Sequence, residues 1–189
     1  MRRTALGYNL LYQKKRSPLG FTLVELLVVI AVMVVLVVMV MVFLNPFEQV
    51  KRTRDANRLT DLALIKQAID ISSEEATGSA EQILCHDTTA PCRGFSTSDS
   101  KSNNGTGWLK IDLSNNKTAA LSSLPVDEIN DATYHYTYCS DGKNWEINAV
   151  LESEKQAPLM GSDGGNDNAK YEIGSDLTLI SSTGGVCNF

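Results

Sequence analysis

The side chains of this 189-residue chain that could do chemistry do not form the patterns that enzymes use. Its two histidines, His86 and His135, lie far apart in the sequence, and neither belongs to a pair with metal-ligand spacing. The chain has no nucleophile elbow and no glycine-rich loop that would cradle phosphate. Scattered serines and aspartates could join either histidine, but a chain of this size supplies such trios by chance. We therefore predict that the protein is not an enzyme.

A second group of chemically capable side chains lies in GSDGGNDNAKYE, residues 161–172. Asp163, Asn166 and Asp167 place oxygen ligands among glycines, a composition that can hold calcium. The spacing does not match an EF-hand loop, and loops rich in Asp, Asn and Gly are usually only turns. The prediction is therefore no cofactor, with calcium at these three residues as the alternative.

The most unusual chemical group is Glu25, the only charge in the apolar run of residues 21–44. At about 1.5 Å per helical residue this run spans roughly 36 Å, which exceeds the ~30 Å hydrocarbon core of a bilayer. A secretory signal peptide would have a shorter apolar region and small residues at its cleavage site. The run therefore predicts a transmembrane helix, in which a carboxylate is costly unless it is paired, protonated or close to the interface.

Charge is distributed unevenly along the chain. Residues 1–20 contain five of the 17 Lys and Arg residues and no Asp or Glu, so the sequence from Phe21 onward has a net charge of −10. By the positive-inside tendency, the basic segment predicts a cytoplasmic flank with the rest of the chain outside. Because the acidic remainder lacks the clustered cations that grip phosphates, no direct binding of nucleic acid is expected.

The cysteines all follow the apolar run, at Cys85, Cys92, Cys139 and Cys187. An even number of cysteines beyond a membrane segment favours disulfides, because that compartment is oxidising. Free buried thiols are the alternative. A zinc site is not expected, since the sequence contains no Cys-x2-Cys pair.

The residues around the start of the apolar run suggest what Glu25 does. Gly20-Phe21-Thr22-Leu23-Val24-Glu25, behind a short basic leader, resembles the class III signal of type IV pilins and type II secretion pseudopilins. In that family a membrane-embedded prepilin peptidase cuts after the glycine and methylates the new amino terminus. The resemblance implies cleavage between Gly20 and Phe21, N-methylation of Phe21, and an assembly role for Glu25. Its carboxylate would pair with the amino-terminal charge of a neighbouring subunit and set the axial register.

The segment after the apolar run returns to helical spacing and resembles the second half of the long pilin helix. Its apolar residues predict an amphipathic helix over residues 45–77 that ends near Thr77-Gly78. Asn45-Pro46 predicts a kink or break before it, because proline removes a helical hydrogen bond. The apolar stripe consists of Ala56, Leu59, Leu62, Ala63, Ile65 and Ile69. The charges Lys51, Arg52, Arg54, Asp55, Arg58 and Asp61 are expected on a solvated face or as bridges to neighbouring subunits.

The carboxy-terminal part predicts a β-rich head. Strand-like runs occupy residues 107–114, 132–140 and 144–153, with a hairpin turn at 140–143. His135 is expected on a sheet face, and residues 85–107 are expected to form a long loop with a turn at Asn104-Gly105. An antiparallel sheet laid on the helix would bury Leu59, Leu62, Ile69, Ile111, Tyr136, Tyr138, Trp145 and Ile147.

The fold class expected from the resemblance is α+β, a pilin lollipop with a long amino-terminal helix packed on a small antiparallel sheet. The domains are a leader at 1–20, a transmembrane or filament-core helix at 21–44, its amphipathic continuation at 45–77, and a globular head at 78–189. Three disulfide connectivities are possible. The one we favour joins Cys85 to Cys92 and Cys139 to Cys187, as in pilins with a disulfide-bounded terminal region.

The resemblance implies a structural role as a subunit of a type IV pilus or a related filament, used in adhesion, motility, DNA uptake or secretion. The implied partners are further copies of the chain, prepilin peptidase, and the assembly platform with its ATPase. The precursor would cross the inner or cytoplasmic membrane once with its head outside, and the assembled form would lie at the cell surface or span the periplasm. Major pilins, minor tip subunits and pseudopilins share this helix. A single-pass anchored binding domain that does not polymerise is the alternative function.

Overall fold

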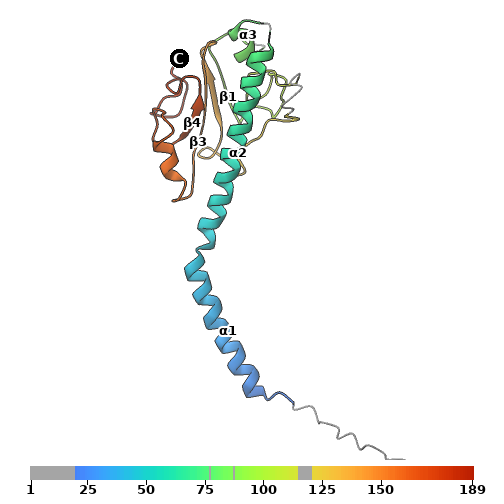
Figure 1. Cartoon of the computed structure of the whole chain (residues 1–189), viewed down its shortest axis with the longest axis vertical. Helices are drawn as coiled ribbons and strands as arrows, with labels where there is room; N and C mark the ends of the chain where they lie inside the picture. The colour runs from blue at the N-terminus through green and yellow to red at the C-terminus, as the bar shows by residue number, and fades with distance from the viewer. Residues whose placement is uncertain (1–19, 77, 87, 115–120) are drawn as a thin grey trace, which may run out of the picture. The chain divides into compact units, whose positions relative to one another are not determined.

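The structure is a computed structural model that describes residues 20–76, 78–86, 88–114 and 121–189. It divides into two compact units, the first ending at Leu44 and the second comprising Asn45–Phe189. Figure 1 shows the elements of both units. The predicted leader lies outside the described residues, apart from Gly20.

The first unit contains one helix, α1 (Leu23–Leu44), and every residue of this helix is exposed. Its most apolar window has a mean hydropathy of 3.6, and by length and composition the helix is able to cross a membrane. The apolar side chains surround the helix instead of forming one stripe. A helix that is apolar all round requires lipid or other helices around it.

The second unit begins where α1 ends. Asn45 has left-handed backbone angles (φ 39°, ψ 71°) and caps α2 (Pro46–Glu75), with its side chain accepting the backbone N–H of Glu48. Proline suits the first turn of a helix, where its missing N–H is not needed. The predicted break at Asn45-Pro46 is therefore confirmed. The helix ends at Glu75, and the C-cap is Ala76 instead of the predicted glycine.

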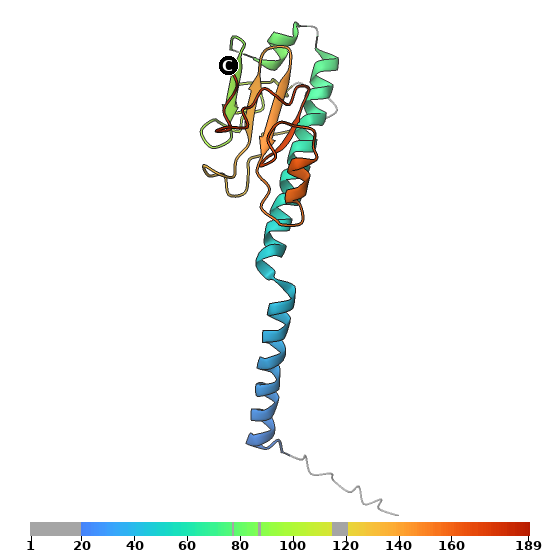
Figure 2. The same cartoon turned by 90° about the vertical axis from the view of Figure 1, so that its left-hand side faces the viewer.

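The remaining elements form a small antiparallel sheet with short helices. The short helix α3 (Ala80–Leu84) lies beside the end of α2, and Figure 2 shows the strands running beside α2. The strands pair in the order β1-β2-β3-β4, each antiparallel to its neighbour. Their bounds are β1 (Cys92–Phe95), β2 (Thr137–Ser140), β3 (Trp145–Ala149) and β4 (Tyr171–Gly174), with the 3-10 helix η1 (Ala157–Gly161) between β3 and β4. The fold is therefore α+β, as predicted.

One face of the sheet packs with α2 into the main hydrophobic core. The largest buried side chains of this core are Leu62, Ile65, Ile69, Trp108, Leu109, Ile111, Leu113, Leu124, Tyr136, Tyr138 and Ile147. The hydroxyl of Tyr138 donates to the backbone oxygen of Leu84 (2.7 Å), and that of Tyr136 donates to Asp61 (2.9 Å). Each buried tyrosine therefore has the polar partner that burial requires. Of the residues predicted to be buried, only Leu59 is not fully buried.

The opposite face of the sheet is covered by the carboxy-terminal segment. Cys139 on β2 forms a disulfide with Cys187, and Leu179 and Ile180 pack with them into a second, smaller cluster. A second disulfide joins Cys85 to Cys92, and thereby ties the residues after α3 to β1. These are the two pairs that the sequence favoured.

Several predicted strands differ from the structure. Residues 107–114 form bends with an isolated bridge between Asn104 and Asp112, although Trp108, Leu109, Ile111 and Leu113 are all buried. Strand β1 lies inside the segment predicted to be a loop, and His135 lies before β2 and not in it. The backbone oxygen of Trp108 would lie 1.8 Å from a Cβ at Gly94, so the irregular segment passes too close to β1 for any side chain there. The predicted turns with glycine at positive φ, at Gly105 and Gly142, are confirmed.

The buried stripe of α2 also differs from the prediction, because it includes charged residues. Asp55 and Arg58 are buried, whereas Ala56 and Ala63 are exposed. The Arg58 guanidinium donates to Asp55 (2.8 Å) and to both oxygens of Asp127, and it forms an ion pair with Glu152 (2.7 Å). These charges therefore join α2 to two loops of the same subunit, so the prediction of a solvated or intersubunit role was wrong for Asp55 and Arg58.

The buried Arg58 cluster is held together by further contacts. Asp55 accepts the backbone N–H groups of Glu152 and Ser153 (2.9 and 2.7 Å), and the Arg58 guanidinium lies over the ring of Tyr134 (4.9 Å). Burial alone would lower the pKa of Arg58, but the hydrogen bonds that its guanidinium donates to Asp127 and Glu152 outweigh burial and raise the pKa above its ordinary value. Arg58 therefore remains a cation, and its acidic partners have a permanent counter-charge.

We predict that Arg58→Met lowers the free energy of unfolding by about 3 to 5 kcal/mol, because it leaves Asp55 and Asp127 buried without their cation, whereas Glu152 keeps its ion pair with Arg54. Thermal unfolding of the full chain in detergent, followed by near-ultraviolet circular dichroism, measures the effect. Arg52→Met is the matched control, since Arg52 forms a partly exposed i,i+4 pair with Glu48 and its loss should cost less than about 1 kcal/mol. Equal losses in the two variants would contradict the assignment of Arg58 as a buried anchor.

The two disulfides should contribute unequally to stability. Their partners are 48 residues apart for Cys139 and Cys187 but 7 apart for Cys85 and Cys92. On the chain-entropy model, replacing both cysteines by serine should cost about 4 kcal/mol for the long loop and about 2.5 kcal/mol for the short one. The same unfolding assay on the two double variants tests this order, and a larger loss from the short loop would contradict it.

Candidate functional site

The candidate site consists of residues 20–25, where the chain enters α1. Gly20, Phe21 and Thr22 precede the helix, and α1 begins at Leu23. Gly20 is exposed, and a Cβ built on it would meet no atom within 4 Å. The peptide bond between Gly20 and Phe21 is therefore open to another molecule, and its first residue has no side chain to obstruct a close approach.

Glu25 is held by the first turn of its own helix. Its Oε2 accepts both the backbone N–H and the hydroxyl of Thr22 (2.9 Å each), while the Thr22 hydroxyl accepts the Glu25 N–H (3.2 Å). This reciprocal arrangement is a capping box, in which a threonine and the glutamate three residues later satisfy backbone donors at the helix start. The carboxylate is thereby held at the positive end of the helix dipole.

The capping box uses only one of the two carboxylate oxygens of Glu25. Among the described residues, Oε1 makes no hydrogen bond, and the side chain is exposed. The open oxygen can accept a donor or cation from another molecule without breaking the cap.

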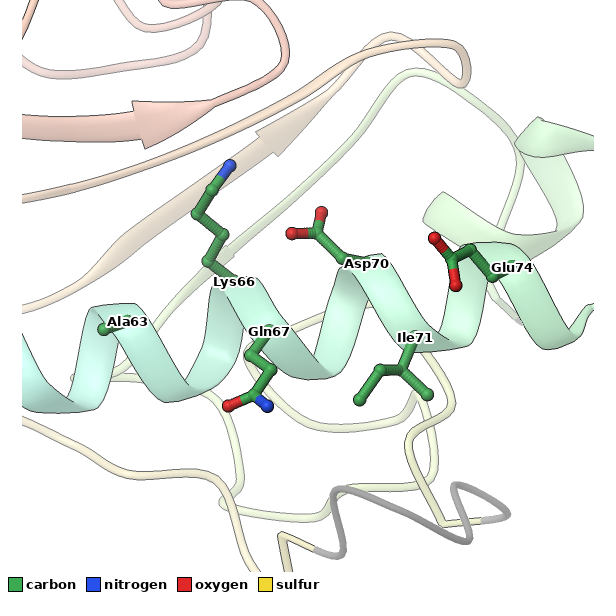
Figure 3. Close-up of a pocket in the computed structure, with 6 residues that line it drawn as sticks. All are labelled: Ala63, Lys66, Gln67, Asp70, Ile71 and Glu74. Atoms are coloured by element: carbon green, nitrogen blue, oxygen red, sulfur yellow. The ribbon is translucent and has the colours of Figure 1, made fainter.

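A shallow pocket on the second unit has no comparable chemistry. It is lined by Ala63, Lys66, Gln67, Asp70, Ile71 and Glu74, which all belong to α2. Figure 3 shows Lys66, Asp70 and Glu74 on one side of the helix and Gln67 and Ile71 on the other. Lys66 lies 5.7 Å from the ring centre of Trp145 in a cation–π contact. The pocket is therefore a stretch of helix surface and not a cleft that encloses a substrate.

The loop considered for calcium uses its side chains on its own backbone. Asp163 accepts the N–H groups of Gly165 and Glu172 (3.0 and 2.8 Å), and Asp167 accepts that of Ala169 (2.9 Å). The amide of Asn166 donates to the backbone oxygen of Ile180 (3.2 Å). Over residues 20–189 except 77, 87 and 115–120, no three His, Cys, Asp or Glu side chains are grouped so that they could hold a metal ion. These oxygen-bearing side chains therefore stabilise the local chain.

The histidines are also separated in the structure. His135 is half-buried before β2, and its Nδ1 lies 3.0 Å from the backbone oxygen of Asp131. Burial lowers the pKa of His135 from its ordinary value. His86 lies near Asp112, with 4.0 Å between the nearest nitrogen and oxygen.

Sequence reasoning missed two sets of residues that the structure groups. Thr22 was part of the motif, but its spacing to Glu25 was not interpreted as a capping box, although the pattern Thr-x-x-Glu before an apolar run indicates one. The pair Glu146 and Glu172 was also missed. Alternation along β3, with Trp145 and Ile147 on the core face, was the signal that Glu146 faces the other way.

Comparison with known proteins supports the interpretation of the amino-terminal site. The family model described as the prokaryotic N-terminal methylation motif matches residues 15–41, which include the whole of residues 20–25. No curated protein and no solved structure matches the chain significantly. The match therefore covers the entry into the apolar helix and most of α1, but none of the second unit.

The capping box predicts the effect of removing one hydroxyl. Thr22→Val loses both side-chain bonds of Thr22, so the Glu25 amide should exchange with solvent about fivefold faster, as expected for a loss of about 1 kcal/mol at a helix cap. Hydrogen exchange of the full chain in micelles measures this rate. Thr60→Val is the control, because its hydroxyl bonds only to Ala56 within α2. If both variants exchange at the rate of the unaltered chain, Thr22 does not cap α1.

Proposed function

Because the chain carries the N-terminal methylation motif of a type IV pilin-like prepilin, we propose that it is a structural subunit of a pilus or pilus-like filament. The observation that carries this proposal is the juxtaposition of the motif with α1, whose residues are all exposed. Such a helix is stable in lipid, and it is equally stable among the apolar helices of other copies. The subunit can therefore leave the membrane without exposing this surface to water.

The first step of the proposed function is processing at residues 20 and 21. A prepilin peptidase would cut the exposed bond between Gly20 and Phe21 and methylate the Phe21 nitrogen. Cleavage creates an α-amino cation one helical turn before Glu25. The exposed Gly20, with free space around its Cα, supports this as the point of cleavage.

The second step is pairing between copies through Glu25. The open Oε1 would accept the Phe21 ammonium group of a neighbouring subunit while Oε2 stays bound to Thr22. In an apolar filament core, an unpaired charge is costly, so neighbours that are out of register are disfavoured. The carboxylate therefore acts as a registration contact, and the apolar side chains of α1 supply most of the buried area.

The proposed function also implies a location and a set of partners. The basic leader would stay in the cytoplasm, α1 would cross the inner or cytoplasmic membrane, and the acidic unit of residues 45–189 would lie outside. Two disulfides in that unit fit an oxidising compartment. An assembly platform and its ATPase would then move processed subunits into a filament at the cell surface or across the periplasm.

Processing is tested by intact-mass and amino-terminal analysis of the chain from cells that contain prepilin peptidase. The expected product begins at Phe21 and carries one added methyl group. Gly20→Val should block cleavage, because a branched side chain would obstruct the approach of the peptidase to this bond, whereas Gly78→Ala in the second unit should not. A mature chain that still contains residues 1–20 would favour the single-pass anchored domain that does not polymerise.

Assembly is tested separately with Glu25→Ala. We expect the variant to be cleaved and to remain in the membrane, but to be lost at least about tenfold from the sheared filament fraction, since the pairing of a buried charge is removed. Glu74→Gln is the control, because it removes a carboxylate from the exposed surface of α2. If Glu25→Ala appears in the filament fraction at the level of the control, the carboxylate does not register the subunits.

A further inference from the structure

The sheet face opposite α2 has several buried polar atoms without partners. Thr137, Glu146, Asn148 and Glu172 are each at most 2% exposed. In the described part of the chain, Thr137 Oγ1, Glu146 Oε1, Asn148 Nδ2 and Glu172 Oε1 are buried and lack a hydrogen-bond partner. Buried polar groups are rarely left unpaired, so this cluster requires an explanation.

Strand register places the two glutamates on the same face. Glu146 on β3 lies opposite Gly174 on β4, and Asn148 lies opposite Glu172. Glu146 and Glu172 are therefore diagonal neighbours across one strand pair, a distance that long side chains can bridge. The unpartnered Oε1 atoms of both carboxyl groups are therefore buried on the same face of the sheet.

Each carboxyl group uses its other oxygen to hold a backbone segment. Glu146 Oε2 accepts the N–H of Ile180 (2.8 Å), and Glu172 Oε2 accepts the N–H of Asp167 (2.9 Å). Ile180 belongs to the carboxy-terminal segment, which Cys187 links to β2. An ionised carboxylate has only acceptors, so two ionised groups could not hydrogen-bond to each other. A single proton between them would supply the missing donor.

The charged groups around the pair do not replace that proton. Asp163 accepts the backbone N–H of Glu172, and its charge and that of Asp167 further disfavour ionisation of Glu172. Lys170 favours the ionised forms of both glutamates, but burial lowers its own pKa. Glu146 and Glu172 nevertheless both have raised pKa values, with burial as the largest cause.

We propose that Glu146 and Glu172 share one proton, and that this protonated pair is a pH-sensitive clasp that holds the carboxy-terminal segment on the sheet. Loss of the proton leaves two carboxylates facing each other in a buried site. Their repulsion and their need for water favour opening of the contact at Ile180. The Cys139–Cys187 disulfide limits how far the segment can move, so the change is local.

The direction of the pH effect follows from the raised pKa. Burial, followed by the interaction with the Glu172 carboxyl group, raises the pKa of Glu146 from 4.5 to about 8. The folded protein therefore binds a proton that the unfolded chain releases above its ordinary pKa. The stabilisation is fully present below about pH 4.5 and is lost progressively as the pH rises to about 8.

Carbon-13 NMR of the glutamate carboxyl groups in the full chain, in micelles, tests whether the proton is shared. We expect one carboxyl titration near pH 8 that disappears in both Glu146→Gln and Glu172→Gln. In each variant the glutamine amide can donate a hydrogen bond to the remaining carboxylate. The remaining group should therefore titrate at least about one pH unit below the value in the unaltered chain. Titration of both groups near the ordinary glutamate value in the unaltered chain would overturn the proposal.

Hydrogen exchange at Ile180 tests the clasp itself. The protection factor of the Ile180 amide, which corrects for the intrinsic exchange rate, should fall at least about tenfold between about pH 6 and about pH 9 in the unaltered chain. In Glu146→Gln this fall should be absent. Glu154→Gln is the control, because it removes an exposed carboxylate and should behave as the unaltered chain does. The same pH dependence in Glu146→Gln and the unaltered chain would overturn the clasp. If Glu146→Gln does not fold, Glu172→Gln supplies the same comparison through the other half of the pair.

Discussion

The uncovered apolar surface of α1 is the constraint on which the other features of this protein depend. All backbone hydrogen bonds of a helix are internal, so α1 can exist in a medium without water, but its side chains have nothing to bury against within the chain. Lipid and a bundle of equivalent helices both satisfy this need. Because the two environments are similarly apolar, the free energy of moving α1 from one to the other is small, and in the proposed filament a single contact at Glu25 would decide the register.

The second unit has the opposite organisation, because its apolar side chains are buried within the unit itself. One sheet face packs on α2 around aromatic and aliphatic side chains, and the buried Arg58 cluster fixes that helix to the loops containing Asp127 and Glu152. The other face has fewer apolar residues and depends on the Cys139–Cys187 disulfide and the pair Glu146 and Glu172. Buried ionic contacts need accurate geometry to offset desolvation, so they favour one arrangement of the loops over others.

The sequence predicted best those elements whose signal lies in neighbouring residues. The apolar run, the break at Asn45-Pro46 and the hairpin turn at Gly142 each depend on neighbouring residues, and all were correct. Prediction failed for residues 107–114 and for the buried charges of α2, whose partners lie far along the chain. Residues 107–114 have strand-like composition, yet they bend across β1 at Gly94, and the buried side of α2 includes Asp55 and Arg58 because their partners arrive from residues 127 and 152.

The sequence by itself determined the entry into the membrane helix. A threonine, a glutamate three residues later and an unbroken apolar run specify the start of a helix that needs an apolar partner, because helix start signals and hydropathy act over a few residues. Only the tertiary structure decided which charges are buried and which cysteines pair. Strand register brings Glu146 to Glu172, and the path of the carboxy-terminal segment brings Cys139 to Cys187. Residues so far apart in the sequence pair only through the packing of the whole unit.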